Sequence, residues 1–391
     1  MKTFRRISFV CLGLFLLAAV GAVLTAAFLI RPYHPMLADE PLAGRIIDGK
    51  SAAGRIWLVG GIGPVKSLIS LDHNLTHLAS HYGRGVVAIS DGEGGPWVLL
   101  VRDIPNWLFY RGGAFQVRVR VDRWNGDRFL PGAWVRLGKM EVPIGVVVDD
   151  GAPVVLTSNA LYASSGAGWK RTALKGAVLR VGSGFHFDSQ VTPRDDSVIY
   201  AGSNLGEWGG GIQRIDIATG IVTETGETSP VTGLAADRER SDCVLAAVGL
   251  RHFGEHGRVV RVCPDGMEVV LERKHKELSG TLVDEWSEAM SGIAVTDGEF
   301  WTSTYESTFT QELLPSDPAS KSKSYLVRED RRRHVLYRLG AGQVARYQMP
   351  KPASANGLYV ARPHPKVLVI ATNIKGPLEK GRFKPLLIAL D

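Results

Sequence analysis

Histidine and carboxylate side chains gather in one glycine-flanked segment, at His252, Glu255 and His256. Imidazoles and carboxylates can bind a divalent metal ion or exchange protons with a substrate. Two histidines four residues apart in such a loop are not a zinc signature, so a polar rim facing water is the alternative. With residues from other loops and strand starts they form one expected ligand-binding face: Asp188, Glu207, Trp208, His252, His256, Tyr305, Glu306, Asn356 and Asn373.

Two cysteines offer redox chemistry. Cys243 and Cys263 flank an apolar hairpin almost symmetrically about Phe253, so they can face each other across adjacent strands. Outside the cytoplasm such a pair can oxidise to a disulfide. A slip of one residue in strand register would put them on opposite faces, which leaves two buried thiols as the alternative.

Two other motifs are set aside. The segment GGIGPVKS (60–67) imitates a phosphate-binding loop, but Val65 stands where the glycine before Lys66 belongs, and a strand pattern follows. We therefore expect no nucleotide. His73, His77 and His81 would share one face of a helix, but a turn at Asp72 and a strand after it separate them, so we expect no metal there.

The N-terminus predicts a membrane anchor. Residues 1–6 carry three positive charges, and residues 7–30 contain none. As a helix this run spans ~36 Å, against a hydrocarbon core of ~30 Å. A long cleaved signal peptide is the alternative. The positive-inside rule puts residues 1–6 in the cytoplasm and everything after the anchor in the periplasmic or extracytoplasmic space, where no nucleic acid is expected.

Composition predicts a globular all-β domain after a linker at residues 31–42. The 391 residues include 45 glycines and 20 prolines spread along the chain, which implies many turns and short elements. The formal net charge of +7 is a mild bias. Its densest basic run, Arg331 to His334, predicts either a solvated loop or a contact with lipid head groups or an acidic partner.

A strand–turn–strand pattern recurs along residues 43–391. Most copies follow a second hairpin, made of a small-residue strand, an Asp/Gly turn and a strongly apolar strand. Two hairpins in about fifty residues make a four-stranded antiparallel blade of a β-propeller. The first pattern occupies residues 67–80, 107–121, 160–174, 211–225, 258–272, 335–349 and, truncated, 385–391. The second occupies residues 84–101, 144–158, 232–248, 291–304 and 356–372.

Seven copies predict a seven-bladed β-propeller. Because the last copy stops at its turn, we expect residues 43–49 to pair beside residues 385–391 and close the ring. Within each blade the turns between strands one and two and between three and four are short. The long connections all lie on the other face, where loops on a rigid scaffold usually carry function. They include residues 203–211, 250–257, 305–333 and 372–384.

The chain resembles the β-propeller repeat superfamily along most of residues 43–391. Within it, ANGLYVARPHPKVLVIATN (355–373) is similar to the Asn-Gly segment of strictosidine-synthase-like and gluconolactonase-type propellers. That resemblance implies that Asn356 binds a calcium ion at the channel, where the ion polarises an ester or lactone.

Two functions from different classes follow, and the sequence does not decide whether the protein is an enzyme. The first is a membrane-tethered binding module without a cofactor, which holds a partner protein or envelope component on the long-loop face, with residues 305–333 as contact or lid. The alternative is a calcium-dependent lactonase or esterase with Asn356 and Asp188 as metal ligands. A weaker third interpretation is sugar binding by Trp208, Trp286 and Trp301.

Overall fold

The computed structural model describes most of the chain after residue 44. No helix among these residues is long and apolar enough to cross a membrane. The predicted tail, anchor and linker lie outside the described part. The described ranges are 45–62, 65–72, 77–82, 85–92, 94–102, 116–165, 168–180, 189–194, 197–237, 239–249, 257–272, 283–287, 291–296, 299–313, 325–340, 343–348, 359–364, 367–371 and 386–389.

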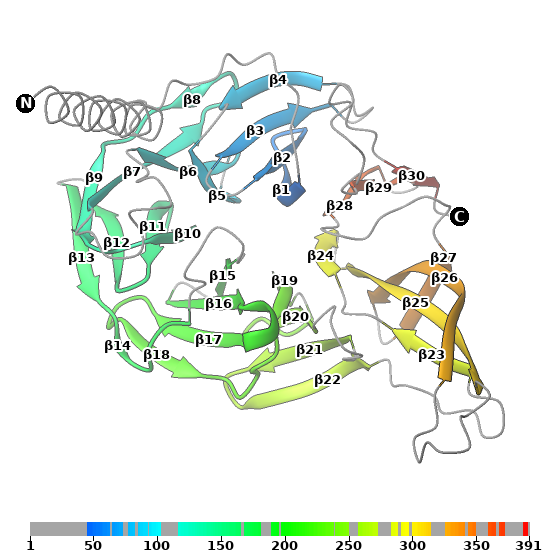
Figure 1. Ribbon diagram of the computed structural model, residues 1–391. Coiled ribbons are helices and arrows are strands. Elements are labelled where there is room, and N and C mark those ends of the chain that lie inside the picture. Colours follow the sequence, from blue (N-terminus) through cyan, green and yellow to red (C-terminus); the bar gives the residue numbers. More distant parts are fainter. Residues whose placement is uncertain are drawn as a thin grey trace, which may run out of the picture.

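Seven sheets follow one another around one axis (Figure 1). Within the described strands, each sheet is built from one contiguous stretch of chain. The first sheet contains β1 (Arg45–Ala52), β2 (Arg55–Ile62), β3 (Val65–Leu71) and β4 (His77–Tyr82). The second contains β5 (Val86–Ser90), β6 (Trp97–Arg102) and β7 (Gln116–Trp124), with β8 (Phe129–Leu130) and β9 (Val135–Lys139) both paired with the outer edge of β7. The third contains β10 (Pro143–Asp149), β11 (Ala152–Thr157), β12 (Ala160–Ser165) and β13 (Gly168–Ala173).

The fourth and fifth sheets repeat this plan. A short parallel strand adds to the outer edge of the fourth sheet. These sheets are β15 (Ser189–Arg194), β16 (Val198–Asn204), β17 (Gly210–Asp216) and β18 (Ile221–Glu224) with β14 (Lys175–Gly176) outside; and β19 (Val231–Ala236), β20 (Val244–Val248), β21 (Arg258–Cys263) and β22 (Gly266–Glu272).

The last two sheets complete the ring but depart from the plan. The sixth has a long central hairpin, and the seventh has three described strands. They are β23 (Val283–Ser287), β24 (Ser291–Thr296), β25 (Glu299–Leu313), β26 (Tyr325–Gly340) and β27 (Gln343–Gln348); and β28 (Tyr359–His364), β29 (Val367–Ala371) and β30 (Leu386–Ala389).

The innermost strands form a closed circle. In order they are β1, β5, β10, β15, β19, β24 and β28, each lies next to the following one, and β28 lies next to β1. The predicted all-β propeller is therefore confirmed. Blades with four antiparallel strands are confirmed in the five sheets between Arg45 and Glu272, and the expectation of seven regular blades is not met by the last two sheets.

Ring closure differs from the prediction. Residues 43–49 were expected beside residues 385–391, but within the described strands β1 pairs with β2 and β30 pairs with β29. The segment after Arg45 is thus the innermost strand of the first blade, not the outermost strand of the last. The alternation of apolar and polar residues identifies a strand, but the strand with which it pairs depends on contacts with residues that are distant in the sequence.

The interval between Tyr305 and Arg333 also differs from the prediction of a loop. β25 continues to Leu313 and β26 begins at Tyr325, and the two strands pair from Phe300↔Leu339 to Leu313↔Tyr325. The run Arg331 to His334 therefore lies within a strand. Threonine, tyrosine and phenylalanine are frequent between residues 302 and 310, and these residue types favour strands.

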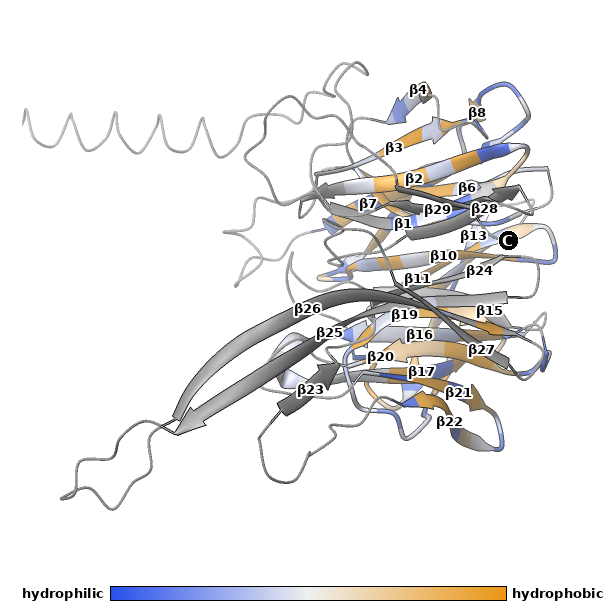
Figure 2. Ribbon diagram, turned by 90° about the vertical axis from the view of Figure 1, so that its right-hand side faces the viewer, coloured by the Kyte–Doolittle hydropathy of each residue, from blue (hydrophilic) through white to orange (hydrophobic). Residues whose placement is uncertain are grey.

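The apolar core lies between neighbouring blades. Five side-chain clusters bridge the five successive junctions from the first blade to the sixth sheet. The second strands are therefore covered on both faces, and β20 is buried along its whole length. The outermost strand β13 is mostly exposed. Apolar residues accordingly fill the strands, and hydrophilic residues lie at the turns (Figure 2).

Tight two-residue turns connect the first two strands in the first and third blades. Asp150 and Gly151 have φ of 44° and 69° between the paired residues Asp149 and Ala152. Positive φ at both central positions matches the right-handed strand twist, and Asp-Gly is the sequence that adopts it most readily. These turns all face away from the long-loop face.

Candidate functional site

The long-loop face is fixed by the strand order. In each blade the connection into the first strand and the loop between the second and third strands emerge at the same end. Among the described residues the larger segments of this face are the turn Gly138–Glu141, the turn Thr157–Ala160, residues 176–180, the loop 204–210 and residues 224–231. We use "long-loop face" for these segments.

The structure describes only some of the sequence-predicted site residues. Glu207 and Trp208 belong to the one-turn 3-10 helix η2 (Gly206–Trp208) on the long-loop face. Tyr305 and Glu306 lie within β25 rather than in a loop. The remaining candidates fall outside the described residues, so the predicted convergence at the channel is not tested: Asp188, His252, His256, Asn356 and Asn373.

The cysteine pair is a disulfide. Cys243 and Cys263 are bonded, with their Cα atoms 4.3 Å apart and both side chains buried. Of the two alternatives the sequence left open, the structure has the cross-link. It joins the start of β20 to the end of β21, at the end of the fifth blade opposite the long-loop face.

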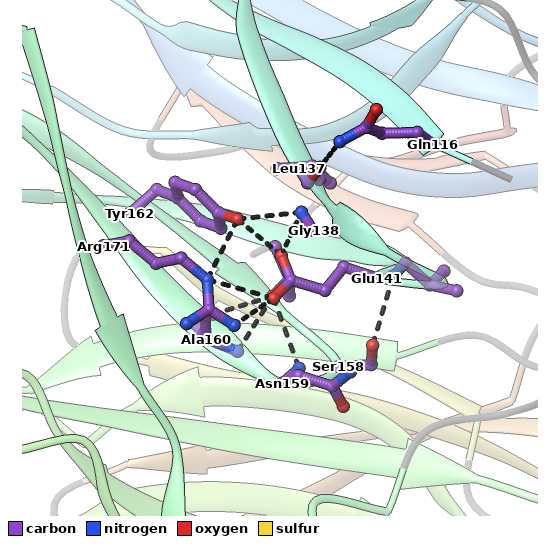
Figure 3. Close-up of polar contacts among 11 residues, drawn as sticks. Gln116, Leu137, Gly138, Glu141, Ser158, Asn159, Ala160, Tyr162 and Arg171 are labelled. Carbon is purple, nitrogen blue, oxygen red and sulfur yellow. Dashed lines mark hydrogen bonds and ion pairs between the residues drawn. The ribbon is translucent and has the colours of Figure 1, made fainter. Parts of the chain in front are cut away.

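A buried carboxylate that the sequence did not single out anchors the turn leading into the third blade. Tyr162 donates a hydrogen bond of 2.5 Å to Glu141 Oε2, and the amide of Gly138 donates another of 2.9 Å to the same oxygen. Arg171 binds Oε1 through Nε at 3.1 Å and through its terminal nitrogen. Figure 3 shows the Glu141 carboxylate enclosed by these donors.

The hydrogen bonds decide the ionisation of this group. Burial acts to raise the pKa of Glu141, but the hydrogen bonds from Tyr162, Arg171 and Gly138 outweigh it, so the pKa lies below its ordinary value. Burial and the bond to Glu141 raise the pKa of Tyr162. Glu141 is therefore a fixed anion beside a neutral phenol, which suits a structural clamp and does not suit a general base.

Similar clamps fasten the next two blades. In the fourth blade Arg180 lies 3.3 Å from Glu224 Oε2 and donates to the carbonyl of Gly210 at 2.8 Å. In the fifth blade Arg258 donates to both oxygens of Glu227, at 3.0 and 3.1 Å. Each arginine–glutamate pair ties the connection entering a blade to a strand of that same blade.

All four carboxylates that are buried among the described residues have an arginine partner. Since their oxygens are engaged, these groups serve the scaffold rather than acid–base chemistry. Three of these pairs cannot be read from sequence spacing, because their partners lie 24 to 31 residues apart and are brought together by strand pairing within one blade; in the fourth, both residues lie on β7. The pairs are Asp122 with Arg120, Glu141 with Arg171, Glu227 with Arg258, and Asp237 with Arg261.

Apolar side chains are exposed on the long-loop face of the blades that these ion pairs hold in place. Trp208 is 79% exposed, Val178 is 86% exposed and Met140 is 55% exposed. The loop that carries Trp208 is held by its own hydrogen bonds, because Leu205 donates to Gly209 O at 2.9 Å and Gly210 donates to Thr228 O at 2.9 Å. The indole is thus presented from a fixed position.

The lowered pKa of Glu141 makes the stability of the protein depend on pH. A carboxyl group whose pKa is lower in the folded protein stabilises it above the ordinary value of 4.5, and this contribution is lost as the pH falls through the folded-state pKa. We expect the urea midpoint of the wild type to drop between about pH 5 and about pH 3 more steeply than that of Glu141→Gln. Urea unfolding at several pH values measures this. Asp127→Asn, which also removes one carboxylate, is the control for the change of net charge, and a slope in Glu141→Gln no shallower than in Asp127→Asn would contradict the argument.

The similarity of this chain to known proteins is a similarity of fold. No protein-family model matches the chain, and no curated protein sequence matches it. Solved structures that resemble it include YCF48 bound to D1 peptide, with 13% identity, 92% of this chain and 96% of that chain covered and a TM-score of 0.48. A putative 6-phosphogluconolactonase from Bacteroides fragilis has 11% identity, with 88% of this chain and 98% of that chain covered, and a TM-score of 0.45. The periplasmic gluconolactonase PpgL of Pseudomonas aeruginosa has 12% identity, coverage of 84% and 93% and a TM-score of 0.45. Gluconolactonase-type propellers are thus among the structures that this chain resembles, and similarities of this size carry no argument about its activity.

Proposed function

We propose that the protein is a membrane-anchored, extracytoplasmic β-propeller that binds a partner protein or envelope component through its long-loop face. Residues 7–30 are the anchor in this proposal, and the sixth and seventh sheets complete a seven-bladed ring. The observation that carries the proposal is the exposure of Trp208, with Val178 and Met140, on one face of a rigid frame. Exposed apolar side chains at such a place favour protein recognition, and tryptophan is frequent among residues that dominate binding energy.

Crosslinking tests the proposed face. A photoreactive amino acid at Val178, in the full chain in its native membrane, should capture one dominant species. The same group at Asp150, in a turn on the opposite face, is the matched control and should capture much less. Trp208→Ser should remove the Val178 product. Equal capture from both positions, or a product indifferent to Trp208→Ser, would refute the proposal.

A calcium-dependent lactonase or esterase remains the competing function. Its proposed ligands, Asn356 and Asp188, predict about one tightly bound calcium ion per chain in protein purified without chelator. Bound calcium together with lactone or ester hydrolysis, both unaffected by Trp208→Ser and lost in Asn356→Ala, would replace the binding-module proposal.

A substitution at Met140 should affect partner binding and the stability of the fold in opposite directions. It has φ of 60°, the left-handed conformation that glycine adopts without cost. Met140→Gly should therefore raise the free energy of unfolding by about 0.5–1 kcal/mol while it weakens partner binding. Lys139→Gly, in the same turn at a position without positive φ, should instead lower stability by about the same amount. Urea unfolding measures both, and a clear loss of stability in Met140→Gly would show that the methionine serves the fold.

A further inference from the structure

Three arginines line up across the second blade. Arg102 pairs with Arg118 in the register of β6 and β7, and Arg118 pairs with Arg136 in that of β7 and β9. Residues paired in this way project from the same face of a sheet, and neighbouring strands lie ~4.8 Å apart. The three cationic side chains, which we call the basic row, therefore span ~10 Å.

Like charges directly opposite each other concentrate positive potential at this edge of the sheet. The surrounding segment is also basic. Residues 116–139 contain six cationic and two anionic side chains, a net charge of +4, whereas the whole chain carries +7. More than half of the net charge of the protein thus lies in the outer strands of one blade.

An indole ring orders part of this surface. The guanidinium of Arg120 lies 4.9 Å from the ring centre of Trp134, and that of Arg102 lies 5.9 Å from it. Arg120 is in turn bound to the buried carboxylate of Asp122. Stacking on an aromatic ring limits the rotamers of a guanidinium, which lowers the entropy lost when it binds an anion.

The basic row adjoins the long-loop face. Arg102 ends β6 at that face, and Arg136 lies two residues before the Gly138–Glu141 turn with its exposed Met140. The start of β7 is held at the same place, because Gln116 donates a hydrogen bond of 3.0 Å to the carbonyl of Leu137 (Figure 3). A charged edge beside exposed apolar side chains is the usual layout of a protein–protein interface.

We infer that the basic row binds a carboxylate-rich segment of the partner that the long-loop face recognises. This inference rests on the proposed function and names the chemistry of the partner. Arginine forms two parallel hydrogen bonds with one carboxylate, so three arginines in a row select an acidic segment and repel basic ones. The adjacent apolar side chains favour a protein segment over the head groups of lipids.

Labelled poly-L-glutamate is the probe, with the full chain in neutral detergent and fluorescence anisotropy as the measurement. The double variant Arg118→Glu/Arg136→Glu should bind about tenfold more weakly than the wild type and lose most of the salt dependence. Arg123→Glu/Arg128→Glu is the matched control, since it makes the same change of charge at the other end of the same blade. The control should bind within about twofold of the wild type, and all variants should share the wild-type urea midpoint to within about 0.5 M.

Each other outcome overturns the inference. No binding of poly-L-glutamate by the wild type would exclude an acidic segment, and equal loss in both double variants would reduce the effect to net charge. Binding to phosphatidylglycerol vesicles but not to poly-L-glutamate, with the same dependence on Arg118 and Arg136, would assign the row to lipid. If the Val178 crosslink persists in Arg118→Glu/Arg136→Glu, the proposed function stands and the inference alone fails.

Discussion

Replacing Arg258 by methionine is expected to lower the free energy of unfolding by about 3 kcal/mol. The side chain of Glu227 is fully buried, whereas that of Arg258 is one-third exposed. Without the guanidinium, the carboxylate keeps the amide of Ser229, 2.7 Å from Oε1, as the donor that holds it. A buried anion with so little compensation costs several kcal/mol, and urea unfolding near neutral pH measures the loss.

Two further variants separate the buried charge from lost packing. Arg180→Met breaks the corresponding pair in the fourth blade, but there the side chains of Arg180 and Glu224 are 34% and 39% exposed, so we expect a loss below about 1 kcal/mol. Adding Glu227→Leu to Arg258→Met removes the stranded carboxylate and should restore part of the stability. A loss in Arg180→Met as large as that in Arg258→Met would contradict the argument from burial.

Removing the disulfide should lower the free energy of unfolding by about as much as Arg258→Met does. Cys243 and Cys263 are 20 residues apart in the sequence, and the entropy of closing a loop of this size corresponds to about 3 kcal/mol. We expect Cys243→Ala/Cys263→Ala to lose this amount in thermal or urea unfolding. Because the bond holds β20 and β21 together at one end, hydrogen exchange should become faster first in these two strands.

Reduction provides the control for the disulfide. Treating the wild type with a thiol reductant should lower its stability to that of the double alanine variant, and the variant itself should not respond. If the variant is as stable as the oxidised wild type, the cross-link contributes nothing beyond local packing. A large response of the variant to reductant would point to a different cause.

The strands could be predicted because each hairpin is local. The segments 144–158 and 258–272 alternate around Asp/Gly or Pro-Asp-Gly turns, and both form the expected pairs of strands. The register of such a hairpin follows from its turn and its own apolar pattern. The role of the segment after Arg45 could not be predicted, because innermost and outermost strands have the same alternation and differ only in which distant neighbour covers them.

The candidate site was predicted less well for a related reason. Trp208 was identified because it lies in residues 203–211, one of the long connections expected on the functional face. Glu141 was missed because its partners Tyr162 and Arg171 lie 21 and 30 residues away, and only the pairing of β12 with β13 brings these two together. The arginines of the basic row appear in the sequence as ordinary alternation, and strand register alone aligns them.

The closure of the ring bears on how the protein is made. Among the described strands each sheet comes from a contiguous stretch of chain, and the first and last sheets meet where β28 lies next to β1 with no described strand in common. Blades can therefore form in order as the chain leaves the ribosome, each docking on the one before it. Of the junctions between described innermost strands, the one between β1 and β28 must wait until the seventh sheet has been synthesised, so maturation of the propeller should include one late, long-range step between its first and last blades.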